Sequence, residues 1–363
     1  MWLINVDTLQ LEEFIGKTVP KYAILSHTWG DGEVSFREMA KRKTWEETVQ
    51  KPGFNKISKC CEMAALVHLK YAWVDTCCID KKSSAELSEA INSMWQYYEE
   101  AYICFVHMAD VRLEGSHLNK EQFQSSRWFT RGWTLQELLA PRDVRFFDQS
   151  WNLLGDQQTL CDLIVAATGI ESLYLDVDID SRFASVACKM SWASRRETTR
   201  SEDVAYCLMG LLKINMPLLY GEKDKAFKRL QTEFIKQHHD ETIFAWTNDH
   251  LINGRLLASC PADFKHSGHV ESLNVEPRQA FEVTNVGIRM TVRVSREDWG
   301  GYRAILSSVT HGTMMEQSPW LKIALQKKDG IYLRLNQKKL EFLTRKEQKA
   351  EQKVKLSSIM LAL

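Results

Sequence analysis

The chain has 363 residues, two or three times the length of a typical domain, so its length predicts one compact core joined to a smaller module. Lysine and arginine together number 47, as do aspartate and glutamate, and this balance excludes the basic footprint of a general nucleic-acid binder. No apolar run reaches about 18 residues, and the first residues are acidic where a signal peptide is basic and then apolar, so we expect a cytoplasmic protein with no membrane span.

Strands and helices alternate through residues 1–150. Short apolar runs predict buried strands at 21–30, 71–80, 101–110 and 143–148. Helical spacing fills residues 54–69, a second helix is predicted after a capping box formed by Ser83 and Glu86, and a third starts near Ser125. This order predicts an α/β fold with a parallel sheet covered by helices on both faces.

Two further regions follow this α/β domain. Residues 151–250 are predicted to be helical, with a capping box at Thr199 and Glu202 and a basic amphipathic helix whose lysines we interpret as a solvated face. Alternating hydrophobicity then predicts a small antiparallel β module over residues 251–363. Asp329 and Gly330 are expected to form a hairpin turn, and the charged tail at 343–356 is either a helix or disordered.

The nine cysteines lie mostly in apolar segments, which favours reduced thiols in the core over disulfides. Cys60 and Cys61, and likewise Cys77 and Cys78, are adjacent rather than spaced as CxxC. Because adjacent side chains of a strand point to opposite faces, we expect structural packing and no metal site.

Polar side chains end the first two predicted strands. Ligands of parallel sheets bind outside the carboxyl ends of the strands, and this rule selects Ser26, His27 and Trp29 after the first strand and Asp75 to Asp80 at the second. Asp75 and Asp80 either face a ligand or cap the following loop. The chain has no GxGxxG, P-loop or GxSxG pattern, and Ser26 and His27 are adjacent, so dinucleotide-fingerprint, NTPase and serine-hydrolase sites are disfavoured.

A carboxylate interrupts the apolar helical stretch RGWTLQELLAP at residues 131–141. Trp133 and Glu137 are four residues apart, so they share one face of a helix. In one interpretation Glu137 pairs with Arg131 or Arg127 while Trp133 packs in the core. In the other, the tryptophan and the glutamate belong to a site.

Three segments resemble the HET domain of fungal heterokaryon incompatibility proteins: KYAILSHTWGDGEVSF, YAWVDTCCIDKKSSAELSEAINSMWQYYEEAYICFVHMADV and SRWFTRGWTLQELLAPRDVRFFDQSW. Residues 192–231 resemble the helical region that commonly follows it, so the resemblance spans roughly residues 1–250. His68 stands where the family often has glycine, and GEKDKAF replaces the more usual GEGxKAF. The resemblance implies programmed cell death after non-self recognition, a form of fungal innate immunity.

HET domains are in turn remotely similar to Toll/interleukin-1 receptor (TIR) domains, which implies a TIR-like, flavodoxin-like sheet. In NAD-cleaving TIR domains a glutamate in the matching segment is catalytic, and this role falls on Glu137, with Trp133 completing a WxxxE pattern. The resemblance thus implies an NAD+ glycohydrolase, with NAD+ as its substrate and no cofactor. It also implies a homo-oligomer on activation and an upstream recognition protein as a partner. The residues expected to bind the substrate are Ser26, His27, Trp29, Asp75, Asp80, Arg131 and Trp133.

A second hypothesis is a non-enzymatic signalling or adaptor module. Such a module would kill the cell by self-association and by recruiting partners through the same domain. It would need no solvent-accessible carboxylate at Glu137.

Overall fold

The computed structural model describes residues 1–16, 18–41, 45–115, 117–248, 254–273, 280–310, 320–335, 337–351 and 354–363. The chain forms two compact units. Unit 1 comprises Met1–Ser181 and Cys207–Leu218, and unit 2 comprises Arg182–Tyr206 and Leu219–Leu363. The region predicted to be helical at 151–250 therefore contributes residues to both units.

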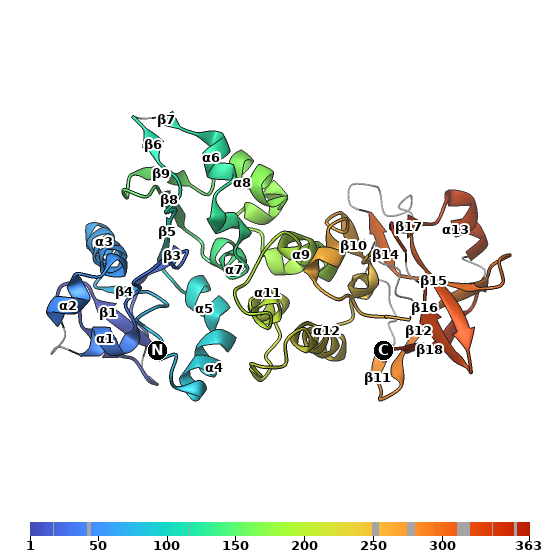
Figure 1. Cartoon of the computed structure of the whole chain (residues 1–363). Coiled ribbons are helices and arrows are strands. Elements are labelled where there is room, and N and C mark those ends of the chain that lie inside the picture. Colours follow the sequence, from blue (N-terminus) through green and yellow to red (C-terminus); the bar gives the residue numbers. More distant parts are fainter. Residues whose placement is uncertain are drawn as a thin grey trace. The chain divides into compact units, whose positions relative to one another are not determined.

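Unit 1 is built on a seven-stranded sheet in the order β2-β1-β4-β3-β5-β8-β9 (Figure 1). Its strands are β1 (Trp2–Asn5), β2 (Leu11–Glu13), β3 (Ala23–His27), β4 (Tyr71–Trp73), β5 (Ile103–His107), β8 (Val144–Phe147) and β9 (Leu153–Asp156). The four central strands, β4, β3, β5 and β8, run parallel, whereas β1, β2 and β9 are antiparallel to their neighbours. The predicted α/β fold and its four parallel strands are confirmed.

The central strands are covered on both faces, as their continuous apolar sequences require. Every residue of β3 and β5 is buried, helix α3 (Pro52–Leu66) contacts β3 and β4, and helix α7 (Thr134–Leu139) contacts β3. Among the four parallel strands, β3 comes first along the chain and lies beside the third, β5, so the order reverses between them. Such a reversal is where ligands of open α/β sheets bind, at the carboxyl ends of the strands.

The remaining elements of unit 1 are short. They are α1 (Phe36–Ala40), α2 (Trp45–Val49), α4 (Ser84–Asn92), α5 (Met94–Glu99), β6 (Leu113–Glu114), β7 (His117–Leu118), α6 (Lys120–Gln124), the 3-10 helices η2 (Arg127–Thr130) and η3 (Ser172–Leu175), α8 (Cys161–Thr168) and α11 (Met209–Leu212), while η4 (Ser181–Phe183) spans the boundary between the units.

Local chemistry corrects three details of unit 1. Strand β4 ends at Trp73 rather than at Asp80, because the chain turns at Val74, where the backbone N–H is taken by the Cys78 sulfur at 3.4 Å. The helix after Ser83 breaks at Ser93 into α4 and α5. Ser83 does cap α4, but the Glu86 carboxylate accepts the N–H of Asp80 (2.9 Å) instead of closing the capping box. Strands β1, β2 and β9 were not predicted.

Unit 2 combines helices with a small closed β-barrel (Figure 1). The barrel strands are β12 (Gly287–Arg296), β13 (Tyr302–Ile305), β15 (Leu321–Lys328), β16 (Ile331–Arg334) and β18 (Leu356–Ala362), and β18 closes the barrel by pairing with both β16 and β12. Strands β11 (Glu282–Val283) and β17 (Glu341–Phe342) extend it, and β10 (Val270–Ser272) pairs with β14 (Ser308–Thr310). The helices are α9 (Val186–Ala193), α10 (Asp203–Tyr206), α12 (Lys225–Gln237), η5 (Glu241–Phe244), η6 (Pro261–Phe264) and α13 (Arg345–Glu351).

The predicted hairpin is confirmed, since Asp329 and Gly330 both have positive φ and join the antiparallel strands β15 and β16. Within the charged tail, Arg345–Glu351 form helix α13, and Leu356–Ala362 form β18, a strand that was not predicted. Because β16 and β18 are parallel, the module is not purely antiparallel. The capping box at Thr199 and Glu202 was wrong: the Glu202 carboxylate accepts the N–H groups of Gly221 and Lys223 instead.

Two expectations concerned the state of the cysteines and the absence of a membrane span. Seven of the nine cysteines are buried, and all nine are free thiols. Across the described ranges, no helix combines the length and the apolar character that crossing a bilayer demands.

Candidate active site at the carboxyl edge of the parallel strands

The end of β3 presents polar side chains to both faces of the sheet. Ser26 and His27 are consecutive and both buried, and consecutive side chains of a strand point to opposite sides. Ser26 lies on the side of α7, and His27 lies on the side of α3. The two faces therefore carry two different polar clusters.

On the first face, Ser26 holds the carboxylate of Glu137. Its hydroxyl donates a hydrogen bond to Glu137 Oε2 and accepts one from Trp128 Nε1 at 2.8 Å. Glu137 lies in the first turn of α7 and is half-buried, whereas Trp128 is buried. The carboxylate of Glu137 is thus held at the carboxyl edge of β3, on a residue that is half-buried.

The segment before α7 is pinned so that this contact can form. Ser126 caps η2 by accepting the Trp128 N–H at 3.3 Å, and its hydroxyl donates to Asp110 at 2.6 Å. The Thr134 hydroxyl donates to the carbonyl oxygen of Trp128 at 2.6 Å, which joins the end of η2 to the first residue of α7. Because both ends of the turn are tied, α7 presents Glu137 to β3 in one orientation.

Tyr98 completes the surroundings of Glu137. The Tyr98 hydroxyl donates to the carbonyl oxygen of Leu25 at 3.2 Å. Burial raises the pKa of Tyr98, and the negative charge of Glu137 raises it further, so the phenol stays neutral at physiological pH. The same two causes raise the pKa of the Cys104 thiol, whose sulfur contacts the backbone oxygen of Glu137 at 3.9 Å.

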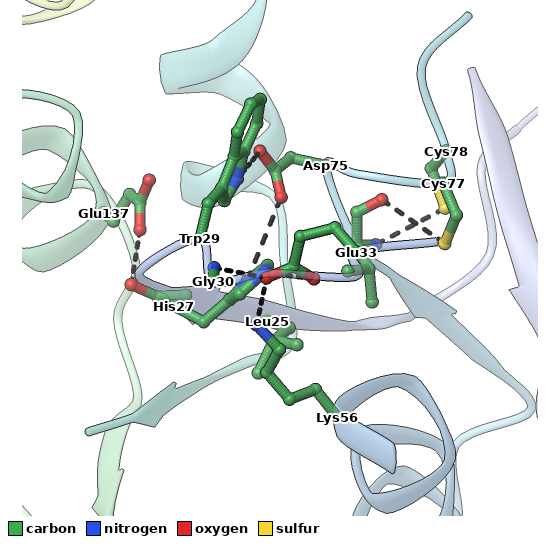
Figure 2. A network of polar contacts seen from close by, with 12 residues as sticks. Leu25, His27, Trp29, Gly30, Glu33, Lys56, Asp75, Cys77, Cys78 and Glu137 are labelled. Carbon is green, nitrogen blue, oxygen red and sulfur yellow. Dashed lines mark hydrogen bonds and ion pairs between the residues drawn. The ribbon is translucent and has the colours of Figure 1, made fainter. Parts of the chain in front are cut away.

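On the second face, His27 lies between two carboxylates. His27 Nδ1 is 3.9 Å from Asp75 Oδ1, and His27 Nε2 is 3.7 Å from Glu33 Oε2 (Figure 2). Glu33 also accepts the N–H of Gly30 at 2.8 Å and pairs with Lys56. Burial alone would raise the pKa of Glu33, but the contacts with His27, Gly30 and Lys56 outweigh it and lower the pKa to about 2.

Close packing of α3 brings Lys56 to this cluster. Gly53, the second residue of α3, donates its N–H to the carbonyl oxygen of Gly32 at 3.2 Å. A Cβ at Gly53 would lie 2.7 Å from the Cα of Glu33, so only glycine allows the start of the helix to approach this loop. Lys56 follows almost one turn later and faces Glu33.

Asp75 joins the second cluster to an exposed aromatic ring. Trp29 Nε1 donates to Asp75 Oδ2 at 2.9 Å, and 47% of Trp29 is exposed (Figure 2). Lys81 Nζ lies 3.8 Å from the same carboxylate oxygen and 3.6 Å from the centroid of the Trp29 ring. Asp75 thus contacts the side chains of His27, Trp29 and Lys81, which favours the site interpretation over a simple loop cap.

The other predicted site residues lie as follows. Asp80 is half-buried, and its carboxylate accepts the Lys82 N–H at 3.0 Å and lies 3.8 Å from Arg37, which are the contacts of a loop cap. Trp133 is the N-cap residue of α7 and Arg131 the C-cap residue of η2, and both are half-buried. Among the described residues, no group of three or more histidine, cysteine, aspartate or glutamate side chains is arranged to hold a metal ion.

Four residues of these clusters were not predicted: Glu33, Lys56, Lys81 and Trp128. Glu33 and Lys81 had a detectable signal, because each lies in the loop that follows a predicted parallel strand. Trp128 lies in the segment SRWFTRGWTLQEL, five residues before Trp133. Lys56 had no such signal, since its charge on α3 is typical of a solvated helix face.

Comparison with known proteins shows which family part of the chain resembles. Residues 22–119 match the family model of the heterokaryon incompatibility protein (HET). The chain is also 45% identical over 226 residues to the vegetative incompatibility protein HET-E-1 of Podospora anserina, an alignment that covers 60% of this chain and 16% of that protein. Residues 22–119 are therefore similar to the HET domain. The chain spans only a small part of the length of this relative, and no solved structure matches it.

The segment that matches the HET family model contains one side of the candidate site. It includes β3 with Ser26 and His27, and the loops with Trp29, Asp75 and Lys81. It ends before η2 and α7, which supply Trp128 and Glu137. The hydrogen bond from Ser26 to Glu137 therefore joins the matched segment to the part of unit 1 that follows it.

Proposed function

We propose that this chain acts in fungal heterokaryon incompatibility and triggers programmed cell death by cleaving NAD+ between nicotinamide and ribose. The HET domain and the name of the vegetative incompatibility relative support the biological role. The cleavage is supported by one observation above all: a half-buried carboxylate, Glu137, is held by Ser26 at the carboxyl edge of the parallel strands.

The topology supports the TIR-like part of this proposal. In chain order the parallel strands lie second, first, third, fourth, which is the order of flavodoxin-like sheets. Glu137 lies on α7, the last helix between the third and the fourth of these strands, and the resemblance to NAD-cleaving TIR domains implies a catalytic glutamate in this segment.

The reaction asks for one well-placed carboxylate. When the bond from the nicotinamide nitrogen to ribose C1′ breaks, its electron pair leaves with nicotinamide and a positive oxocarbenium centre forms on the ribose. The Glu137 carboxylate stabilises this charge and orients the ribose hydroxyls. Water then adds to C1′ and releases one proton, which gives ADP-ribose. Ser26 is a positioning residue, because it fixes the carboxylate and is itself fixed by Trp128.

The decisive experiment measures nicotinamide released from NAD+ by the purified chain over a range of protein concentrations. Glu137→Gln preserves size and hydrogen bonding but removes the charge, so we expect a loss of about 10²- to 10³-fold in rate, the usual cost of removing one group that stabilises transition-state charge. Glu62→Gln is the matched control, because Glu62 lies on the exposed surface of α3. A Glu137→Gln variant as active as the wild type would overturn the assignment.

The same titration addresses self-association. If a homo-oligomer is the active form, the rate per molecule rises with protein concentration and then reaches a plateau. A rate per molecule that is constant from nanomolar to high micromolar concentration would contradict the oligomer.

The adaptor hypothesis has one observation in its favour. A serine hydroxyl bonded to both a carboxylate and a buried indole also satisfies three polar groups of a packed fold. The two hypotheses differ in fungal cells: if the wild type kills without releasing nicotinamide and Glu137→Gln kills equally well, the chain acts as an adaptor. Killing that is lost together with NAD+ cleavage in Glu137→Gln excludes the adaptor.

A further inference from the structure

Lys81 occupies a position that packing alone does not require. Its ammonium lies 3.6 Å from the centroid of the Trp29 ring and 3.8 Å from Asp75, on the loop after β4. Burial lowers the pKa of Lys81, and the charge of Asp75 opposes that shift. The ammonium is therefore held at ion-pair distance by the Asp75 carboxylate, while 34% of its side chain stays exposed.

Trp29 is an aromatic platform held in place. The hydrogen bond from its indole N–H to Asp75 at 2.9 Å fixes the ring, yet 47% of the residue remains exposed. Fixed and exposed aromatic faces stack on heterocyclic bases, and they also attract cations such as the lysine ammonium. In this structure the Lys81 ammonium occupies a place on the ring that a base can take.

The charges around the platform make Lys81 important for an anionic ligand. Glu33, Asp75 and Glu137 bring three carboxylates to the loops around the end of β3. Lys56 faces this region too, but it is paired with Glu33, and its side chain is only 14% exposed. Lys81 has a flexible stem and a side chain that is 34% exposed, so it can turn toward a phosphate that approaches Trp29.

We propose that Trp29 and Lys81 form a nucleotide subsite: the base of the ligand stacks on the Trp29 ring, and Lys81 leaves the ring to pair with the adjacent phosphate. Asp75 is the positioning residue that holds the indole and, without ligand, the ammonium. This inference rests on the proposed function, since it assigns the nucleotide part of NAD+ to one side of the site and leaves the nicotinamide riboside part to Glu137.

The test measures binding of ADP-ribose and of adenosine to the full chain by calorimetry. ADP-ribose carries the base and the diphosphate but lacks the bond that Glu137 would break, so its binding needs no catalysis. Because a hydrogen bond to a charged group contributes about 1.5–3 kcal/mol, Lys81→Gln is expected to weaken ADP-ribose binding by about tenfold or more. Adenosine, which has no phosphate, should bind the variant and the wild type equally.

Two further variants make the test specific. Lys82→Gln removes the neighbouring exposed lysine and should leave both affinities unchanged. Asp75→Asn keeps an acceptor for the Trp29 N–H but removes the charge that competes for Lys81, so ADP-ribose binding should be kept or strengthened. Equal binding of ADP-ribose and adenosine by the wild type, or an equal loss in Lys82→Gln, would overturn the subsite.

The failure of this inference is distinguishable from that of the proposed function. If Lys81→Gln loses ADP-ribose binding while the wild type releases no nicotinamide, the subsite stands and the cleavage does not. If the wild type cleaves NAD+ with a KM that Lys81→Gln leaves unchanged, the cleavage stands and the subsite is wrong.

Discussion

Charged side chains are placed differently in the two units. In unit 1, Glu137, Asp75 and Lys81 gather where parallel strands end, and each keeps part of its surface in solvent. In unit 2, Arg334 of β16 is only 2% exposed; it donates to the carbonyl oxygens of Phe244 (2.9 Å) and Trp246 (2.7 Å) and stacks 3.7 Å over the Trp246 ring. The side chains of the first set are partly exposed, whereas Arg334 is buried and bonded within its own unit.

The barrel wall repeats the structural pattern of unit 2. Arg303 on β13 pairs with Glu297 (2.7 Å), Glu347 (2.9 Å) and Glu351 (3.2 Å), and the last two belong to α13. These pairs fasten α13 to the barrel that β18 closes. Substitutions of charged residues should therefore change stability in unit 2 and ligand binding or catalysis at the sheet edge of unit 1.

The largest expected effect that sharpens this contrast comes from Arg334→Met. The methionine fills similar space but leaves the two carbonyl oxygens without their donor, so we expect unit 2 to lose about 3 kcal/mol of unfolding free energy. Burial lowers the pKa of Arg334 to about 9, although the charge of Asp263 opposes this shift. The guanidinium is therefore charged at neutral pH, and the substitution lowers the unfolding free energy at that pH. The measurement is the urea midpoint at which the β16 amides lose protection from hydrogen exchange.

Arg289→Met is the matched control for Arg334. Arg289 lies on β12, its side chain is 53% exposed, and it pairs with Glu282, so its removal should cost less than about 0.5 kcal/mol. Nicotinamide release per folded molecule should be unchanged in both variants. An Arg334→Met protein that is stable but inactive would break the contrast, because it would place function in unit 2.

A smaller effect is expected from the pH dependence of Glu33. Its pKa is about 2 in the folded chain, against a usual value of 4.5, so its contribution is fully present above pH 4.5 and is lost as the pH falls toward 2. That shift corresponds to about 3–4 kcal/mol, which solvent screening of this partly exposed carboxylate reduces to about 2–3 kcal/mol. The difference in unfolding free energy between the wild type and Glu33→Gln should therefore be largest above pH 5 and shrink toward pH 2.

Glu62→Gln provides the comparison for Glu33. Glu62 pairs with Lys59 on the exposed surface of α3, where ion pairs contribute little, so its removal should leave the pH profile close to that of the wild type. Equal profiles for Glu33→Gln and the wild type would show that the cluster around His27 does not stabilise unit 1.

The sequence predicted those features that rest on local periodicity. The four parallel strands are continuous apolar runs, and the rule for the carboxyl ends of strands selected Ser26, Trp29 and Asp75, which make specific side-chain contacts there. Strand β1 was not predicted, because four residues are too short for a periodic pattern and the strand is defined by its pairing with β4, where Ile4 lies opposite Ala72. Strand β18 was not predicted either, because its partner β12 lies far away along the chain.

Contacts between segments that are distant along the chain could not be predicted from the sequence. Ser26 meets Glu137 across 111 positions, and Trp128 reaches Ser26 across 102, so no spacing pattern connects them. The tryptophan that the WxxxE pattern selected, Trp133, shares a helix turn with Glu137, whereas the one that bonds Ser26 is Trp128. Local spacing found the carboxylate, and only the tertiary structure shows which side chains hold it.

The smallest expected effect is that of Asp80→Ala, which is compared with Asp75→Ala. From the sequence, the same two interpretations were open for both carboxylates. Asp80→Ala removes the acceptor of the Lys82 N–H and a 3.8 Å contact with the exposed Arg37, so we expect a loss of about 0.5–1 kcal/mol in unfolding free energy. Its affinity for ADP-ribose and its rate of nicotinamide release should equal those of the wild type. Asp75→Ala, by contrast, frees the Trp29 indole and should weaken ADP-ribose binding. If Asp80→Ala weakens binding as much as Asp75→Ala does, the loop after β4 acts as one unit, and Asp80 is part of the site rather than a cap.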